Sequence, residues 1–444
     1  MWEIQDFFSE FESARLLNRR IFLCNCPEAV RFVFSTRNDS FERKSPQQRH
    51  ALSPLIGDGL LISDGATWRF RRPLVAPITH ASRLSGLAGP IVQAAHNMRE
   101  RWLTLPPGCE IDIHAEMGTL TADIMCRAVF GEGLPREDAK EVTESFTEYQ
   151  TLIEQIDLAS LIGLPDWFPR PRSRALRKAV KRIHIVIERL IAAYRDADAT
   201  SALGRLMHAR DAETGAPLSG EALRNEIVVL FLAGLESSAN GLTWAWYLLS
   251  QAPEEEARFH AEIDNVLSNR LPTFADFQQL VYTRAVVDEA LRLYPPLPFL
   301  SREAVRDETF RGIAIPKGSL IFVVPWLLHR HGKLWTKPDH FLPERFLPGH
   351  PPPPKFAYIP FSIGPRTCTG MAFGAMEAVM CLATLGQAFG LRLKEGYEVK
   401  PVARLTLRPE DGLPMTLHRR APAIQKTAQQ DTPNEHGCPM LQPD

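Results

Sequence analysis

The stretch Pro360-Phe361-Ser362-Ile363-Gly364-Pro365-Arg366-Thr367-Cys368-Thr369-Gly370 decides the fold of this 444-residue chain. It is a glycine-punctuated loop that leads into an apolar run with helical periodicity, 371–389. Free N–H groups and the dipole at a helix N-terminus favour the thiolate of Cys368. Phe361 can shield the sulfur, Gly370 lets a flat ligand approach the backbone, and Arg366 can bind a carboxylate. These properties describe the fifth ligand of a haem iron.

A lone cysteine beside an apolar helix is more often a small buried hydrophobic residue. The residues around Cys368 decide between a haem ligand and a buried hydrophobic residue. Phe361, Gly364, Arg366, Cys368 and Gly370 match, position for position, the haem-binding signature of the cytochrome P450 superfamily, and the chain resembles its soluble bacterial members. The resemblance implies haem b (iron protoporphyrin IX) as the cofactor, with Cys368 as the axial ligand of the iron.

The composition is that of a globular protein, with 45% hydrophobic and 23% charged residues. A net charge of −1 gives no electrostatic case for binding nucleic acid or an anionic membrane. The seven cysteines are odd in number and form no C-x-x-C pair, which argues against a disulfide framework and suits a cytoplasmic protein. We expect no signal peptide and no membrane span, because the longest apolar run, 227–235, falls short of the roughly 20 residues needed.

The periodicity predicts a mainly α protein with a minor β region. Residues 1–25 predict an edge hairpin, 28–35 a short helix and 37–65 a long irregular loop. Helical patterns cover 67–84, 89–103, 114–130, 136–161, 172–196, 219–250, 254–268 and 286–293, and strand-like runs cover 321–324 and 404–407. We expect one domain over 1–420 and a disordered polar tail over 421–444. The resemblance implies the P450 fold, with haem between the 219–250 and 371–389 helices.

The long helix carries Ala233-Gly234-Leu235-Glu236-Ser237-Ser238 near its middle. On sequence alone a crossing of helices at small residues is the favoured interpretation. The resemblance favours instead an oxygen-binding groove, with Ala233 against the haem and Glu236 and Ser237 as the catalytic acid and alcohol. Ser237 departs from the family's usual threonine but keeps a hydroxyl donor.

Glu289-Ala290-Leu291-Arg292 places an acid and a base three residues apart on one helix face. Such a pair is usually a weak surface ion pair. The resemblance implies that Glu289 and Arg292 join Arg345, from Pro343-Glu344-Arg345-Phe346, in a buried network that serves folding and haem retention.

Trp68 and Arg72 lie four residues apart and share a helix face. A basic amphipathic surface is the alternative, but the spacing resembles the family's W-x-x-x-R, and Arg302 stands at another family position for haem propionates. The basic run 170–182 is interpreted as a solvated helix face in preference to a docking site. A redox partner is expected on the cysteine side, near Arg69 and Arg71.

The resemblance implies a monooxygenase that inserts one oxygen atom of O2 into an apolar organic molecule. Electrons would come from a separate ferredoxin and its reductase, or from a flavodoxin-type donor. The pocket would draw on 37–65, on the segment around 145–170, and on Leu297 and Phe299. Two alternatives stay open: a haem-thiolate enzyme that uses peroxide or catalyses isomerisation or dehydration, and a haem sensor or binding protein.

Overall fold

The computed structural model describes residues 11–131, 135–153, 159, 162, 164, 168, 172–194, 201–210 and 215–421. The α-helices in this part of the chain are α1 (Pro27–Arg31), α2 (Pro46–Ile56), α3 (Gly65–Val75), α4 (Leu84–Thr104), α5 (Ile113–Phe130), α6 (Arg136–Leu152), α8 (Arg174–Ala193), α9 (Ala202–His208), α10 (Gly220–Gln251), α11 (Pro253–Leu267), α12 (Val281–Leu293), α13 (Pro325–Leu328) and α14 (Met371–Gly386).

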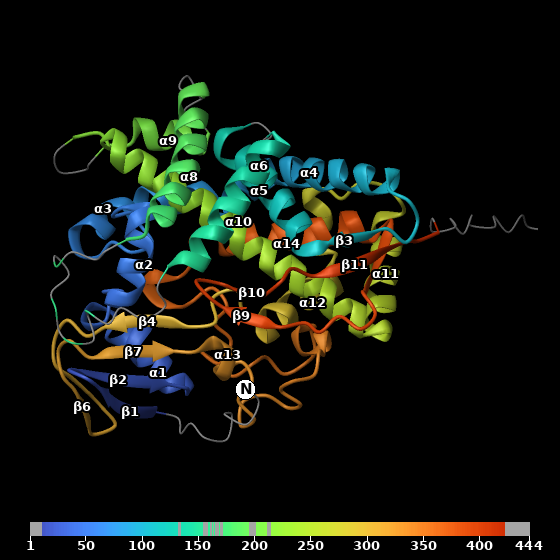
Figure 1. Cartoon of the computed structure of the whole chain (residues 1–444). Coiled ribbons are helices and arrows are strands. Elements are labelled where there is room, and N and C mark those ends of the chain that lie inside the picture. Colours follow the sequence, from blue (N-terminus) through green and yellow to red (C-terminus); the bar gives the residue numbers. More distant parts are fainter. Residues whose placement is uncertain are drawn as a thin grey trace, which may run out of the picture.

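The strands form four small sheets. They are β1 (Phe11–Leu16), β2 (Arg19–Cys24), β3 (Glu110–Asp112), β4 (Leu300–Glu303), β5 (Glu308–Phe310), β6 (Ile313–Ile315), β7 (Leu320–Val323), β8 (Phe389–Leu393), β9 (Pro401–Ala403), β10 (Leu407–Pro409) and β11 (Pro414–Arg419). The largest sheet has the order β1-β2-β7-β4, in which β2 and β7 are parallel. It lies at the lower left of Figure 1, and most of the helices lie above it and to the right.

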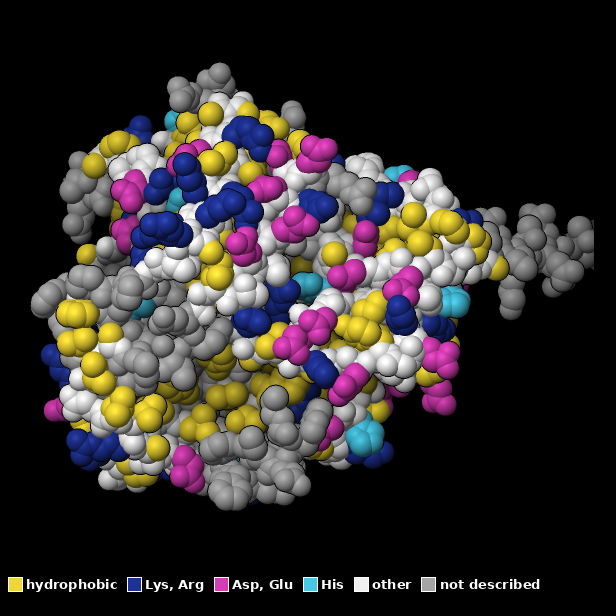
Figure 2. Space-filling model, viewed as in Figure 1, with side chains coloured by type: hydrophobic (Ala, Val, Ile, Leu, Met, Phe, Trp, Pro, Cys, Tyr) yellow, Lys and Arg dark blue, Asp and Glu magenta, His cyan; other side chains and the backbone are white. Residues whose placement is uncertain are grey.

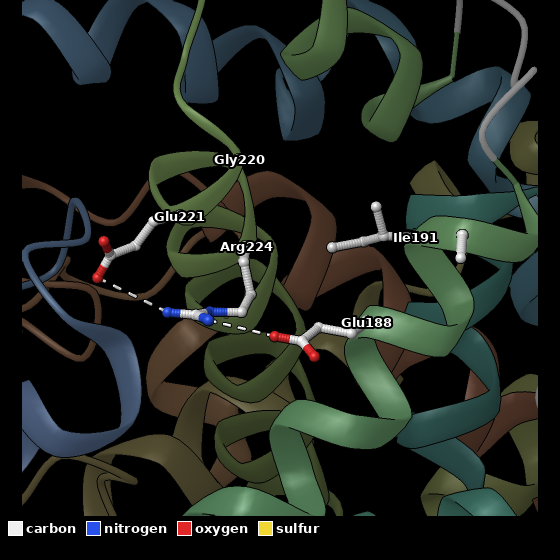
Figure 3. Close-up of a pocket in the computed structure, with 6 residues that line it drawn as sticks. Glu188, Ile191, Gly220, Glu221 and Arg224 are labelled. Atoms are coloured by element: carbon white, nitrogen blue, oxygen red, sulfur yellow. Dashed lines mark hydrogen bonds and ion pairs between the residues drawn. The ribbon is translucent and has the colours of Figure 1, made fainter.

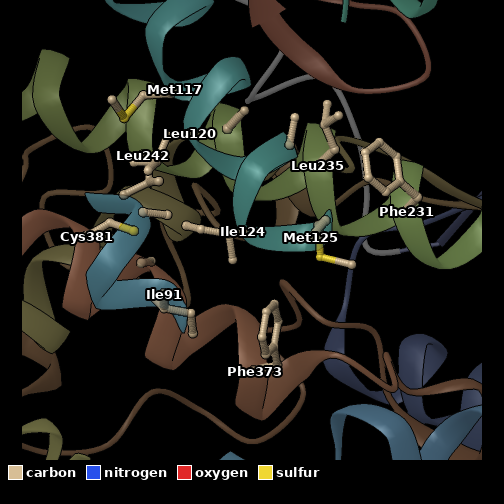
Figure 4. Packing of buried hydrophobic residues seen from close by; sticks show 14 of the residues in the cluster. Ile91, Met117, Leu120, Ile124, Met125, Phe231, Leu235, Leu242, Phe373 and Cys381 are labelled. Carbon is tan, nitrogen blue, oxygen red and sulfur yellow. The ribbon is translucent and has the colours of Figure 1, made fainter. Parts of the chain in front are cut away.

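The main hydrophobic core forms where α4, α5, α10 and α14 meet. Ile91, Ile124, Leu242 and Cys381 come from these four helices and are all completely buried, as Figure 4 shows. α10 is long and apolar enough to cross a membrane, and 78% of its most apolar window is buried inside the protein. A second, smaller core packs on the four-stranded sheet. The cysteine loop precedes α14 and is therefore anchored to the main core.

The predicted mainly α architecture with a minor β region is confirmed, and the N-terminal hairpin is present as β1 and β2. The long irregular loop predicted over 37–65 is wrong, because 46–56 form α2. Ser45 caps this helix by accepting a hydrogen bond from Gln48 N, and Pro46 fits its first turn.

Other predicted boundaries also needed correction. The predicted helix 67–84 ends as α3 at Val75, and two short 3₁₀ turns follow, the first containing Pro77, which lacks an N–H to continue the helix. The predicted strand 404–407 is mostly the turn between β9 and β10. α6 ends at Leu152. Of the predicted tail over 421–444, residues 422–444 lie outside the described residues.

The basic residues of α8 lie on an exposed face. Arg174, Arg177 and Lys178 are exposed, whereas Leu176 and Ala179 are buried against the protein. Figure 2 shows the gathering of Lys and Arg side chains over this helix at the upper left. This arrangement agrees with the predicted solvated helix face.

Arg71 lies in a buried ion cluster. Its Nη1 donates to Glu226 Oε1 at 2.9 Å and its Nη2 donates to Asp58 Oδ2 at 2.8 Å. Glu226 also accepts from Leu60 N at 3.0 Å, so the cluster ties the loop before α3 to the first turns of α10. Arg71 is 5% exposed and therefore offers no surface to a redox partner, whereas the side chain of Arg69 is 64% exposed, so the expected docking near these two residues stays a prediction.

We predict that Arg71→Ala lowers the free energy of unfolding by about 3–5 kcal/mol, because it leaves the Glu226 carboxylate buried without its cation. Chemical denaturation measures the loss. Arg69→Ala is the matched control and should change stability by less than about 1 kcal/mol. A stable Arg71→Ala protein that is reduced more slowly by its donor would contradict this assignment.

Candidate functional site

The cysteine loop is held by one backbone hydrogen bond and one glycine. Cys368 N donates to Phe361 O at 2.9 Å, which closes the loop just before α14 begins. Gly364 has φ +73°, and a Cβ atom at this position would lie 1.9 Å from Phe34 O. A residue with a side chain therefore cannot occupy this position, and the loop packs directly on the backbone that follows α1.

The Cys368 thiol lies in a recess. Many protein atoms lie around it, but the residue is exposed. Burial raises the pKa of the thiol, while a hydrogen bond from the Gly370 N–H and the charge of Arg72 lower it. The N–H of Gly370 therefore favours the thiolate, as the sequence indicates, while burial opposes it. A bound metal cation would deprotonate the thiol outright.

Three buried cations lie near this loop, and none of them forms an ion pair with an acid in the described part of the chain. The charges of Glu42 and Asp64 raise the pKa of Arg366, but burial lowers it more. Arg302 is 1% exposed, and burial together with the charge of Arg366 lowers its pKa to about 9. Arg302 Nε, Arg366 Nε and Arg366 Nη2 have no hydrogen-bond partner within the described residues. Lys44 is 8% exposed, and burial followed by the charges of Arg302 and Arg366 lowers its pKa well below the usual value. Sequence reasoning missed Lys44, because a lysine in a polar loop ordinarily lies in solvent.

Trp68 and Arg72, which share a face of α3, both contact the cysteine loop. The Arg366 guanidinium lies over the Trp68 ring at 4.3 Å, and its Nη1 donates to Ser63 O at 2.7 Å. Arg72 Nη2 donates to Thr367 O at 2.6 Å, which joins α3 to the cysteine loop. The structure thus brings these predicted residues together at one place.

This donor set fits haem b. A ligand with two carboxylates would supply the missing partners of Lys44, Arg302 and Arg366, and a buried cation is costly without one. Cys368 offers a soft ligand suited to iron. Gly370, the residue before α14, lies close to the sulfur, and a Cβ there would lie 3.8 Å from Sγ.

The central segment of α10 presents two different faces. A Cβ atom on Gly234 would lie 2.2 Å from Met125 Sδ on α5, so the glycine does allow a close helix crossing. Ala233, next to it, is exposed although residues 225–232 before it are buried. Ser237 Oγ donates to Ala233 O at 2.6 Å, and α10 is a continuous α-helix through this segment.

Glu236 points away from Ser237, toward α6 and the β9–β10 turn. Its Oε1 accepts from Gln150 Nε2 at 2.8 Å, from Thr406 Oγ1 at 2.9 Å and from Asn240 Nδ2 at 3.3 Å. Its charge also raises the pKa of the buried Arg408, although burial lowers that pKa more. Glu236 thus joins three elements around the middle of α10.

A second acid approaches α10 from the opposite side. Glu377 on α14 is completely buried, and its Oε2 accepts from Ser238 Oγ at 2.5 Å. Burial raises the pKa of Glu377 to about 8, and the bond from Ser238 opposes this only in part. Sequence reasoning missed this residue, although a lone acid in the apolar run 371–386 was a visible signal.

The predicted network behind the site is present. Arg292 Nε donates to Glu289 Oε2 at 2.6 Å and its Nη2 donates to Oε1 at 2.8 Å, with both side chains completely buried. Arg345 Nε donates to Glu289 Oε1 at 3.2 Å. Arg292 also donates to His329 O at 2.8 Å, so the network joins α12 to the segment after α13.

Leu297 and Phe299, the predicted pocket residues, lie between α12 and β4. Leu297 is 36% exposed and Phe299 is half-buried. Much of the segment around 145–170, also predicted to line the pocket, lies outside the described residues.

A recess of about 480 Å³ between α8 and the start of α10 is a separate feature (Figure 3). Arg224 pairs there with Glu188 at 3.2 Å and with Glu221 at 3.7 Å. Its charges are satisfied internally and no predicted site residue lines it, so we do not assign it a function.

The cysteine loop, the buried cations and the α10 segment define a haem-thiolate protein. The Cytochrome P450 family model matches residues 1–415, and the chain belongs to this family. It is 32% identical over 402 residues to "Cyclooctatin synthase" of Streptomyces melanosporofaciens, covering 88% of this chain and 85% of that protein. It is 30% identical to "Cyclooctat-9-en-7-ol 5-monooxygenase" of the same organism, covering 76% of this chain and 73% of that protein.

A third relative includes its own reductase. The chain is 30% identical to "Bifunctional cytochrome P450/NADPH--P450 reductase 2" of Bacillus subtilis (strain 168), with 87% of this chain aligned to 38% of that protein. Together these findings establish an oxidoreductase of the monooxygenase class that uses haem b and hydroxylates an organic substrate.

We predict that Lys44→Met weakens haem binding by about 2 kcal/mol, or roughly 30-fold, because a buried carboxylate of the cofactor then loses one cation. The rate of haem transfer to an acceptor apoprotein measures the effect. Lys178→Met, which removes an exposed cation on α8, is the control and should leave the rate unchanged. Equal rates for the two variants would exclude Lys44 from the site.

We predict that wild-type stability falls relative to Glu377→Gln as the pH rises from about 4.3 to 8. In this window the unfolded chain releases the proton and the folded protein keeps it, so the free energy of unfolding falls by at most about 1.4 kcal/mol per pH unit. Denaturation at several pH values measures the slope. Ser238→Ala should extend the window to higher pH, because it removes the hydrogen bond that opposes burial. Parallel curves for wild type and Glu377→Gln would contradict the raised pKa.

Proposed function

We propose that Cys368 is the axial ligand of the haem iron and that the enzyme hydroxylates an apolar, alicyclic organic molecule with electrons from a separate redox protein. The single observation that carries this proposal is the cysteine loop. Gly364 packs it on the chain after α1, and the buried Arg302 and Arg366 lie nearby with nitrogen atoms that have no hydrogen-bond partner in the described structure.

The proposed cofactor contacts follow from the charges. Lys44, Arg72, Arg302 and Arg366 would hold the two haem carboxylates, and Trp68 would keep the Arg366 guanidinium in place by stacking. Phe361 would shield the thiolate from water. Bound haem supplies the activation of dioxygen, and thiolate ligation favours cleavage of the O–O bond.

On the opposite side of the proposed haem site, α10 supplies the surface on which O2 and the substrate meet. Ala233 offers a small exposed side chain, so the flat cofactor can lie close to the helix. Ser237 carries the hydroxyl nearest to this position and can turn from Ala233 O to donate a hydrogen bond to dioxygen. Glu236 would position the walls of the pocket through Gln150 and Thr406, and remains the predicted acid partner of Ser237.

The substrate class is proposed from the pocket residues and from the relatives. Leu297, Phe299 and Ala233 supply apolar surface, which suits a ligand with few polar groups. The two Streptomyces relatives are named for cyclooctatin and cyclooctat-9-en-7-ol. We therefore propose an apolar alicyclic compound, or its alcohol, as the substrate.

For the electron donor we propose a ferredoxin with its reductase, or a flavodoxin-type protein, that meets the cysteine side at the exposed Arg69. The Bacillus relative shows that a reductase can be joined to this type of domain. We also propose a cytoplasmic location, supported by six cysteines that are free thiols in the described part of the chain.

The test compares the wild type with Cys368→Ser. We predict that the wild type shows the thiolate-type absorption of the ferrous carbon monoxide adduct, and that cyclooctat-9-en-7-ol shifts its Soret band more than a fatty acid does. With a ferredoxin donor it should form a hydroxylated product, while Cys368→Ser loses both the absorption and the product. Cys109→Ser, at a half-buried thiol elsewhere, is the control. Retention of the thiolate-type absorption by Cys368→Ser would refute the ligand assignment.

A further inference from the structure

A second groove lies between α2 and α8, beside the recess of Figure 3, and Glu188 lines both. Its volume of about 600 Å³ is that of a small-molecule site. Two hydrogen bonds join its walls: His184 Nε2 donates to Leu55 O at 2.7 Å, and Arg172 Nη2 donates to Ser53 Oγ at 3.2 Å. These bonds hold the end of α2 at a fixed place beside α8.

The groove has an apolar wall. Leu176, Val180 and His184 follow one another at intervals of four residues and therefore share one face of α8. Leu176 is buried and Val180 is half-buried, and the half-buried Pro54 of α2 also lines the groove. Ile185, another lining residue, is 51% exposed. A ligand with an apolar body would remove this surface from water.

Three cations line the same groove. Arg177 and Lys181 are exposed, lie four residues apart on α8 and form no ion pair with the described part of the chain. Arg172, just before α8, is also exposed and donates to a neutral hydroxyl, that of Ser53. A guanidinium group carries five N–H donors, so Arg172 keeps donors for a ligand.

The acids near these cations already have other partners. Glu188 is the one acid among the described residues that line the groove, and its Oε1 accepts from Arg224 Nη1 at 3.2 Å. Glu141 pairs instead with Arg182 Nε, at 3.5 Å. The groove therefore has an excess of positive charge. A phosphate monoester, with a charge of about −1.5 to −2 at neutral pH, balances this excess better than a single carboxylate does.

We propose that this groove binds a small anionic amphiphile, a phosphate monoester of an apolar alcohol, at a site separate from the haem. The phosphate accepts hydrogen bonds from Arg172, Arg177 and Lys181, because arginine forks fit phosphate oxygens and lysine adds a compact charge. The apolar body lies between Pro54 and Val180. Binding is non-covalent, and the inference does not rest on the proposed iron ligand or substrate.

The test is calorimetric titration of the holoenzyme with octyl phosphate, kept below the concentration at which it forms micelles. We expect saturable binding at one site. Octanol and inorganic phosphate should each bind roughly tenfold more weakly or less, because octanol lacks the charge and inorganic phosphate lacks the apolar body. Equal binding of octyl phosphate and octanol, or no binding of octyl phosphate, would overturn the proposal.

Four variants of exposed residues on one helix locate the site. Arg177→Gln and Lys181→Gln should each weaken octyl phosphate binding by about tenfold, since each removes a charged donor to the phosphate. Arg174→Gln and Lys178→Gln remove exposed cations of α8 that do not line the groove, and at physiological salt they should change the affinity by less than about twofold. Equal losses in all four variants would show attraction to the whole basic face and would contradict a site in the groove.

Two further measurements separate the groove from other places where an amphiphile binds. Octyl phosphate that shifts the Soret band, with an affinity unchanged in Arg177→Gln, would place the ligand at the haem and refute the proposal. Sedimentation tests phosphatidylcholine vesicles that contain phosphatidic acid. If the holoenzyme sediments with them through Arg177 and Lys181 but does not bind free octyl phosphate, the groove is a membrane contact and the proposed soluble ligand is excluded.

Discussion

The constraint on which this structure depends is the burial of three positive charges that form no ion pair in the described part of the chain. Lys44, Arg302 and Arg366 come from three separate segments, and burial lowers the pKa of each. A protein core rarely tolerates such a cluster, since each cation loses its hydration and repels the others. The rings of Phe34 and Trp68, over which Arg302 and Arg366 lie, offset part of this cost, and we propose that the two carboxylates of haem offset the rest.

The parts of the site that the sequence predicted share one property: their spacing is local. Cys368 follows its glycines within one loop, and Glu289 and Arg292 lie on one helix face, so short-range geometry brings these residues together. Lys44 and Arg71 could not be placed in this way. Each stands in a polar or basic stretch that indicates a solvated surface, and only long-range packing against α10 or the cysteine loop buries it.

The difference between local and long-range interactions also explains which helices and strands the sequence predicted. The long helices followed from apolar periodicity, whereas α2 was missed because proline, glutamine and histidine dominate its sequence and a single capping serine starts it. The strand expected over 404–407 failed because its alternation belongs to a tight hairpin. Thr406 in this turn donates a hydrogen bond to Glu236, so a tertiary contact determines the backbone conformation there.

The contact between Gly364 and Phe34 fixes the cysteine loop to the N-terminal segment that follows β2 and α1. Because Gly364 lies against the Phe34 carbonyl, a displacement of the segment after α1 would also displace the loop that carries the Cys368 sulfur. Exchange of the segment around Phe34 between related enzymes would therefore displace the loop that carries Cys368, and chimeras would have to take both partners of this contact from the same parent.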